Sequence, residues 1–137
     1  RKRLKGRDMI HKFPVHVYYE DTDLAGIVYY ANYFKFIERA RTEWVREAGV
    51  DQVALKADDG IVFAVRRVEA DYLLPAKFDE DLTVETEVEA ITGVRIVLNQ
   101  TVKRADAILF VSQVTLVALS ETGQPTRLPA NIRRNLH

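Results

Sequence analysis

The chain has 137 residues, 47% of them apolar, which suits a single domain with a substantial hydrophobic core. It contains no cysteine, so disulfides, thiolate nucleophiles and zinc–thiolate sites are excluded. The formal net charge is zero, but residues 13–120 hold 11 basic and 18 acidic side chains, and such an acidic domain is unlike a nucleic-acid-binding one.

The first twelve residues are strongly basic. Residues 1–12 hold six basic side chains and one acidic one, and no apolar signal core follows them. We expect a flexible arm here, which either stays solvated or contacts a phosphate group, an anionic membrane or an acidic partner. No apolar run reaches the roughly 18 residues that a membrane-spanning helix needs, so we expect a cytoplasmic protein with one domain at residues 13–137.

Residues 13–49 predict a strand, a polar loop and a long helix. Residues 13–19 are rich in β-branched and aromatic side chains, which favour a strand. The polar residues 20–26 favour a turn-rich loop. Apolar residues then recur at helical spacing before Gly49, a typical helix end: Tyr33, Phe36, Ile37, Ala40, Trp44, Val45 and Ala48. So many large apolar side chains predict a largely buried helix.

The rest of the chain predicts an antiparallel sheet. We expect a short helix and loop at residues 51–58, and then four long strands with short turns between them: residues 61–73, 82–90, 94–103 and 107–119. In residues 82–90 we expect one apolar face: Leu82, Val84, Thr86, Val88 and Ala90. The whole order predicts an α+β hot-dog fold, in which an antiparallel sheet of about five strands wraps around one long central helix. Its open edges predict a homodimer or a homotetramer.

Elimination leaves one kind of chemistry. Ser112 and Ser120 lie in or after the last strand, and none of the three histidines stands in a nucleophile-elbow sequence. No cluster has zinc-ligand spacing and no glycine-rich loop resembles a nucleotide cradle, so we expect no metal. An enzyme of this sequence would work with carboxylates, hydroxyls and backbone amides.

The loop before the long helix offers these groups. Glu20, Asp21 and Asp23 are three acids within four residues, and the helix that follows begins with N–H groups that lack partners. Such amides stabilise an oxyanion, while a carboxylate attacks a carbonyl or activates water. The loop is therefore suited to acyl transfer. It is also compatible with acids that only cap the helix and with a Gly26 that only turns the chain.

This segment resembles a known family. The pattern Tyr-Tyr-Glu-Asp-Thr-Asp-x-x-Gly-x-Val-Tyr-x-x-x-Tyr at residues 18–33, followed by residues 38–43, is similar to the Tol–Pal-associated acyl-CoA thioesterases of YbgC type, in the 4-hydroxybenzoyl-CoA thioesterase superfamily. The likeness extends from about residue 13 to about residue 134. It includes Phe63-Ala64-Val65-Arg66-Arg67, Tyr72-x-x-Pro75-Ala76 and Leu128-Pro129.

The resemblance implies hydrolysis of an acyl-CoA thioester, with coenzyme A as part of the substrate and no separate cofactor. It implies that Asp23 is the catalytic aspartate, either as nucleophile through an anhydride or as general base. It also implies that the backbone N–H of Tyr30 binds the thioester oxygen, with Gly26 letting the loop approach closely. Family members usually carry a histidine in place of Tyr30, so a histidine partner for Asp23 is absent here.

Further residues have both a functional and a structural interpretation. Phosphate groups of coenzyme A would meet basic side chains, and the candidates are Arg66, Arg67, Arg95, Lys103 and Arg104, which are otherwise solvated charges. Thr22 and Asn32 either orient Asp23 or cap the backbone. Glu43 either reaches the cleft or pairs with Arg39. The aromatic residues of the helix either line an acyl pocket or pack in the core: Tyr33, Phe36 and Trp44.

Two other functions stay open. The first is a hot-dog hydratase or dehydratase acting on acyl thioesters, which usually needs a histidine near the helix. The second is a noncatalytic module that binds acyl-CoA or an acyl carrier. A weak association with a membrane, with Tol–Pal or with lipid-synthesis proteins is implied by the family alone.

Overall fold

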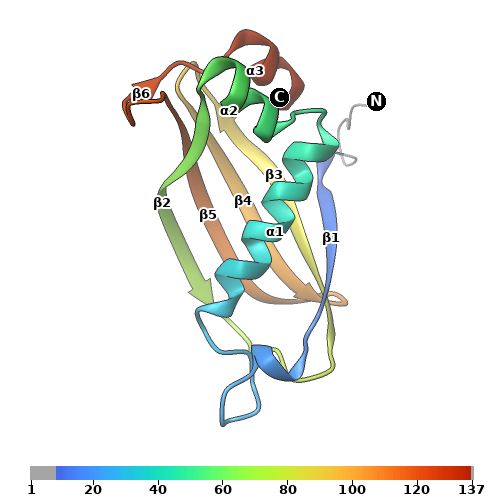
Figure 1. Ribbon diagram of the computed structural model, residues 1–137. Coiled ribbons are helices and arrows are strands. Elements are labelled where there is room, and N and C mark those ends of the chain that lie inside the picture. The colour runs from blue at the N-terminus through green and yellow to red at the C-terminus, as the bar shows by residue number, and fades with distance from the viewer. Residues whose placement is uncertain (1–8, 137) are drawn as a thin grey trace.

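The structure is a computed structural model that describes residues 9–136. These residues form the following elements: β1 (His11–His16), the 3₁₀ helix η2 (Tyr19–Asp21), α1 (Asn32–Glu47), α2 (Gln52–Asp59), β2 (Val62–Tyr72), β3 (Asp81–Ile91), β4 (Arg95–Arg104), β5 (Ala107–Leu119), β6 (Pro125–Thr126) and α3 (Ala130–Leu136). The strands pair antiparallel in the order β1-β3-β4-β5-β2, and β6 adds to β5. Figure 1 shows the sheet curving behind α1, with β1 and β2 at opposite edges. The predicted α+β architecture is confirmed.

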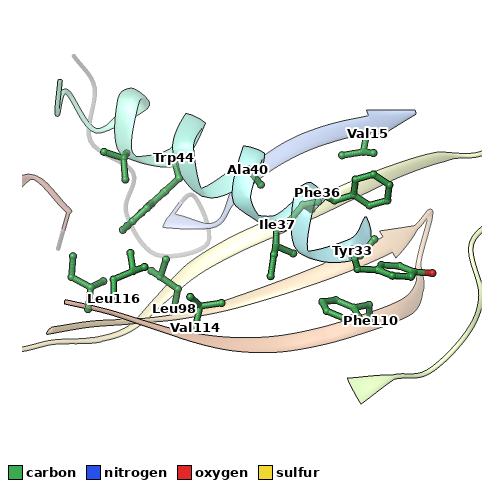
Figure 2. Close-up of a cluster of buried hydrophobic side chains, with 14 of the residues drawn as sticks. Val15, Tyr33, Phe36, Ile37, Ala40, Trp44, Leu98, Phe110, Val114 and Leu116 are labelled. Carbon is green, nitrogen blue, oxygen red and sulfur yellow. The ribbon is translucent and has the colours of Figure 1, made fainter. Parts of the chain in front are cut away.

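The core lies between α1 and the concave face of the sheet. Figure 2 shows Ile37 and Trp44 of α1 pointing toward Leu98, Val114 and Leu116 of the sheet, while Phe36 lies near Val15 of β1. Phe36 and Ile37 are at most 1% exposed, and full burial of a side chain of this size stabilises a fold by roughly 1.5–3 kcal/mol. The helical period of the sequence therefore arises from packing. Phe36 and Trp44 are core residues, as their structural interpretation predicted, and Tyr33 is buried as well.

A buried polar network fixes α1 against the sheet. The side-chain oxygen of Gln100 in β4 accepts a hydrogen bond from Arg41 Nη1 at 2.9 Å. Its amide nitrogen donates to the carbonyl oxygen of Ile37 and to Thr86 Oγ1, both at 2.9 Å. Because Gln100 and Thr86 are fully buried, loss of one partner would leave a polar group unsatisfied. The network thus sets where α1 lies along the sheet.

Several boundaries differ from the prediction. The first strand is β1 at His11–His16, not residues 13–19, because Tyr18 N donates to Asp21 Oδ2 at 2.8 Å and closes the turn η2 there. His11 and Lys12 therefore belong to the sheet and not to the N-terminal arm. The arm's residues 1–8 lie outside the described residues.

Two further features were not predicted. A β-bulge between Val88 and Ala90 interrupts the alternation of β3, so Ala90 is exposed rather than part of the apolar face. The C-terminal helix α3 buries Ile132 and Leu136 against the core. No helix of the described residues is long and apolar enough to cross a membrane.

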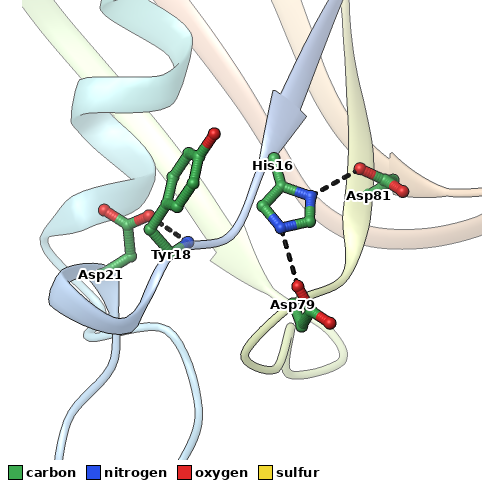
Figure 3. A network of polar contacts seen from close by, with 5 residues as sticks. All are labelled: His16, Tyr18, Asp21, Asp79 and Asp81. Carbon is green, nitrogen blue, oxygen red and sulfur yellow. Dashed lines mark hydrogen bonds and ion pairs between the residues drawn. The ribbon is translucent and has the colours of Figure 1, made fainter.

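A histidine at the end of β1 forms hydrogen bonds to two aspartates near the start of β3. His16, the last residue of β1, contacts Asp81 Oδ1 through Nδ1 at 2.7 Å and Asp79 Oδ1 through Nε2 at 2.9 Å, as Figure 3 shows. Carboxylates only accept, so only the doubly protonated ring donates to both. The hydrogen bond to Asp81 raises the pKa of His16, and Asp79 acts in the same direction.

The hydrogen bonds of His16 to Asp79 and Asp81 predict a pH-dependent contribution to stability. Since the pKa of His16 in the folded state lies above its ordinary value of 6.5, the contribution is fully present below pH 6.5 and is lost as the pH rises through the folded pKa. We expect His16→Gln to destabilise the protein more at acidic than at alkaline pH, as measured by urea unfolding of both proteins across the range. If the free energies of unfolding of the two proteins differed by the same amount at every pH, a stabilising role for protonated His16 would be contradicted.

Candidate active site

The loop between β1 and α1 is ordered around Asp21. The carboxylate of Asp21 caps η2, as Figure 3 shows, and the residue is buried. Its backbone carbonyl oxygen accepts from Tyr29 N and from Asn32 Nδ2, both at 2.9 Å. Thr22 Oγ1 donates to the carbonyl oxygen of Tyr19 at 2.9 Å. Thr22 and Asn32 therefore bind backbone of this loop, as their structural interpretation predicted.

Asp23 lies on the exposed part of the same loop. Its backbone N–H donates to the carbonyl oxygen of Ile27 at 3.0 Å, next to a bridge between Thr22 and Val28. Its carboxylate oxygen Oδ1 accepts from Ala25 N at 2.9 Å, which closes a tight turn. Asp23 is exposed, and this chain alone does not enclose its carboxylate.

The start of α1 has no side-chain cap. Ala31 is the N-cap residue and makes no side-chain capping bond. The interpretation that the acids cap the long helix is therefore wrong for α1, and the carboxylate of Asp21 instead caps η2. In the described part of the chain, the N–H groups of Tyr30 and Ala31 have no hydrogen-bond acceptor. Two donors thus remain available where the helix dipole is positive.

An apolar cleft of about 370 Å³ opens beside this helix start. It lies between the loop, the start of α1 and the end of β2, and it is lined by Ile27, Val28, Tyr30, Tyr33, Tyr72, Leu73, Leu74 and Pro75. Asp23 does not line the cleft. Its backbone N–H, however, donates to the carbonyl oxygen of Ile27, which is a lining residue. The cleft therefore has an apolar wall next to the acidic loop, and this wall includes Tyr30, whose N–H is free. Ligand clefts usually combine these features.

Gly26 has a backbone reason to be glycine. Its φ is +80°, a region that other residues avoid. A Cβ at this position would meet no atom within 4 Å. Within this chain Gly26 therefore serves the turn, and a close approach of the loop to substrate stays a prediction.

The predicted phosphate-binding arginines do not line the cleft. Arg67 pairs with Glu69 at 3.2 Å, and Arg66 is exposed at a bulge of β2. Arg95 begins β4 opposite Val117 of β5. Val117 is seven residues, or roughly 20 Å at the usual strand rise, from Phe110, which pairs with the cleft residue Tyr72. Contact of these arginines with coenzyme A stays a prediction.

Three other charged candidates form contacts within the chain. Lys103 pairs with Glu85 at 3.4 Å, and Arg104 pairs with Glu80 at 2.9 Å. Glu43 pairs on its own helix as predicted, but its partner is Arg46 at 2.8 Å rather than Arg39.

Only two residues of the cleft, Tyr30 and Tyr33, had a role in the interpretation of the sequence. Tyr72 was noted there only as part of the motif Tyr72-x-x-Pro75-Ala76, with no role attached. Its position at the end of a strand, directly before a Pro-containing loop, was a signal that the side chain leaves the regular sheet.

Comparison with known proteins identifies similar chains. The model of the thioesterase superfamily matches residues 25–110. The acyl-CoA thioesterase YbgC of Haemophilus influenzae is 40% identical over 128 residues, which cover 91% of this chain and 93% of that protein. The acyl-CoA thioester hydrolase YbgC of Escherichia coli O157:H7 is 38% identical over 125 residues, which cover 90% and 92%.

Solved structures share the same fold. The "Probable Thioesterase" of Bartonella henselae has a TM-score of 0.84 at 33% identity, covering 88% of this chain and 99% of that one. A 4-hydroxybenzoyl CoA thioesterase mutant complexed with 4-hydroxybenzoyl CoA has a TM-score of 0.88 at 19% identity, covering 94% and 99%. The latter likeness shows the fold alone, and both confirm the hot-dog prediction.

The conformation of Gly26 predicts a modest cost of substitution. We expect Gly26→Ala to lower the free energy of unfolding by about 1–2 kcal/mol, because alanine is strained at positive φ and no clash is added. Gly123→Ala is a matched control, since Gly123 also has a φ of +80° and no atom within 4 Å of a Cβ. Urea unfolding should show similar losses in the free energy of unfolding for both variants. A much larger loss for Gly26→Ala would contradict the absence of a steric clash at Gly26.

Proposed function

Because the chain belongs to the thioesterase superfamily, in the group of the YbgC acyl-CoA thioesterases, we propose that it hydrolyses acyl-CoA thioesters at the cleft beside the start of α1. The chain is a thioester hydrolase, and coenzyme A enters as part of its substrate. The observation that carries the location of the site is the uncapped start of α1, which opens on an apolar cleft.

The reaction is proposed to use backbone amides and one carboxylate. The acyl group occupies the cleft, and its thioester oxygen accepts from the N–H of Tyr30, with Ala31 as the second free donor. As the carbonyl carbon becomes tetrahedral, these donors stabilise the developing oxyanion. Asp23 either attacks the carbon, forming an anhydride that water then opens, or removes a proton from the attacking water. In both cases the C–S bond breaks and the thiolate of coenzyme A takes up a proton.

The histidines support hydrolysis over hydration. Both ring nitrogens of His16 are held by carboxylates, so His16 has no free nitrogen for acid–base work. His11 begins β1, six strand positions from the loop that carries Asp23. Neither described histidine is placed to act at the start of α1, where a hydratase would need one.

We also propose that the protein acts as a homodimer, with a tetramer as the larger alternative. Within residues 9–136, strand β2 is a sheet edge with no partner strand on its outer side. Val65 faces inward by register, opposite the buried Leu116, yet it is 47% exposed. An edge of this kind with half-exposed apolar side chains is a typical pairing surface. The remaining proposals are a cytoplasmic location and no resident cofactor.

The role of Asp23 predicts the effect of an isosteric change. We expect Asp23→Asn to lower kcat/KM at least about 100-fold, because the amide keeps the turn to Ala25 but neither attacks nor takes a proton. Release of free thiol would be measured on acyl-CoAs from acetyl through palmitoyl and benzoyl. Glu20→Gln, an exposed acid of the same loop, is the control and should stay within about twofold of the wild type.

Two results would contradict this assignment. Turnover by Asp23→Asn within about tenfold of the wild type would exclude Asp23 as nucleophile or base. A wild-type protein that binds acyl-CoA but releases no thiol from any member of the panel would favour the binding module instead.

The edge strand predicts the oligomeric state. We expect light scattering after size-exclusion chromatography to give twice the mass of the 15.7 kDa chain, and Val65→Lys to shift the protein toward the monomer. Val94→Lys is a matched control, because Val94 is 43% exposed in the turn between β3 and β4. A monomeric wild type, or equal effects of the two lysines, would argue against pairing through β2.

A further inference from the structure

The end of β2 and the residues that follow it hold the proposed catalytic loop from one side. The hydroxyl of Tyr72 donates to the carbonyl oxygen of Tyr30 at 2.9 Å. Val28 N donates to the carbonyl oxygen of Ala76 at 2.8 Å, and Ala76 N donates to the hydroxyl of Tyr33 at 3.1 Å. The motif Tyr72-x-x-Pro75-Ala76 thus contacts the loop through both of its ends.

The bond from Tyr72 acts on the peptide group between Tyr30 and Ala31. A trans peptide is planar, with its C=O and N–H in opposite directions, and the described chain has no cis peptide. Fixing the carbonyl oxygen of Tyr30 therefore fixes the direction of the free N–H of Ala31. The preceding peptide is fixed in the same way, because the carbonyl oxygen of Tyr29 accepts from Asn32 N at 2.8 Å. That peptide presents the free N–H of Tyr30.

The ring of Tyr72 is itself held in place. It packs edge-on against Phe110 and Tyr33, with ring centroids 5.0 and 5.5 Å apart. Burial raises the pKa of Tyr72, and the neighbouring tyrosines act in the same direction, so the hydroxyl keeps its proton at neutral pH. A hydrogen bond accepted by a carbonyl also polarises its peptide, which strengthens the N–H as a donor.

We propose that Tyr72 is a positioning residue whose hydroxyl aims the Tyr30–Ala31 peptide, so that the free N–H of Ala31 meets the thioester oxygen beside the N–H of Tyr30. This inference rests on the proposed function. Tyr72 touches the backbone and not the reacting atoms. It links the end of the edge strand β2 to the amides that stabilise the oxyanion.

The kinetic test compares Tyr72→Phe with Tyr19→Phe. Phenylalanine keeps the ring in the cleft wall and removes only the hydroxyl. We expect kcat of Tyr72→Phe to fall about tenfold and KM to change less than about twofold, because the aim of the donors matters most in the transition state. Tyr19, a residue that is 82% exposed, should tolerate the same change. An unchanged kcat, or a rise in KM that accounts for the whole loss, would overturn the proposal.

A second measurement tests the same contact without any substrate. The amide proton resonance of Ala31 should move upfield in Tyr72→Phe, because its peptide loses the hydrogen bond at the carbonyl oxygen, and should stay in place in Tyr19→Phe. An Ala31 resonance that does not move would overturn the positioning role even in an active enzyme. If the wild type released no thiol from any acyl-CoA, the proposed function would fail, while this spectrum would still decide whether Tyr72 orients the peptide.

Discussion

The candidate site depends on a helix that begins without a side-chain cap. A helix start usually has its free N–H groups satisfied by an Asp, Ser, Thr or Asn side chain, and three acids stand nearby in this sequence. Folding uses two of them elsewhere, since Asp21 caps η2 and Asp23 accepts from Ala25 in its own turn. Unsatisfied donors in a dry interior would cost stability. Here the cost is smaller because Tyr30 is 61% exposed and does not lie in a dry interior.

Around these donors the backbone is held through its carbonyl oxygens. Asp21 C=O accepts from Tyr29 N and from the Asn32 side chain, and the carbonyl oxygens of Tyr29 and Tyr30 are each occupied as well. This arrangement restricts the peptides without consuming their N–H groups. Donors that are oriented before substrate arrives need no reorganisation during the reaction, which is the main source of oxyanion stabilisation. The Gln100 network extends the restraint to α1 as a whole.

The helices and strands with long sequence periods were predictable from the sequence, whereas the contacts that form the candidate site were not. The alternation in β4 and the helical period of α1 repeat over ten residues or more, so their boundaries were predicted within one residue. Helix α3 has seven residues, too few for a period to show. Tyr72 and Tyr30 are 42 residues apart, and no local pattern indicates that they meet. Whether the Asp23 carboxylate caps α1 or its own turn is decided by the path of the loop, which residue types alone do not reveal.

The tyrosine at position 30 is compatible with this arrangement because backbone and side chain have separate tasks in the proposed site. The N–H of Tyr30 is oriented by the bond between Tyr29 C=O and Asn32 N, which does not involve the Tyr30 ring. The ring instead packs near Tyr29 and Tyr72 and forms part of the cleft wall. In the proposed site, a change of side chain at this position therefore alters the space for the acyl group, while the amide proposed to bind the thioester oxygen keeps its orientation. Catalysis and acyl preference are then able to change independently.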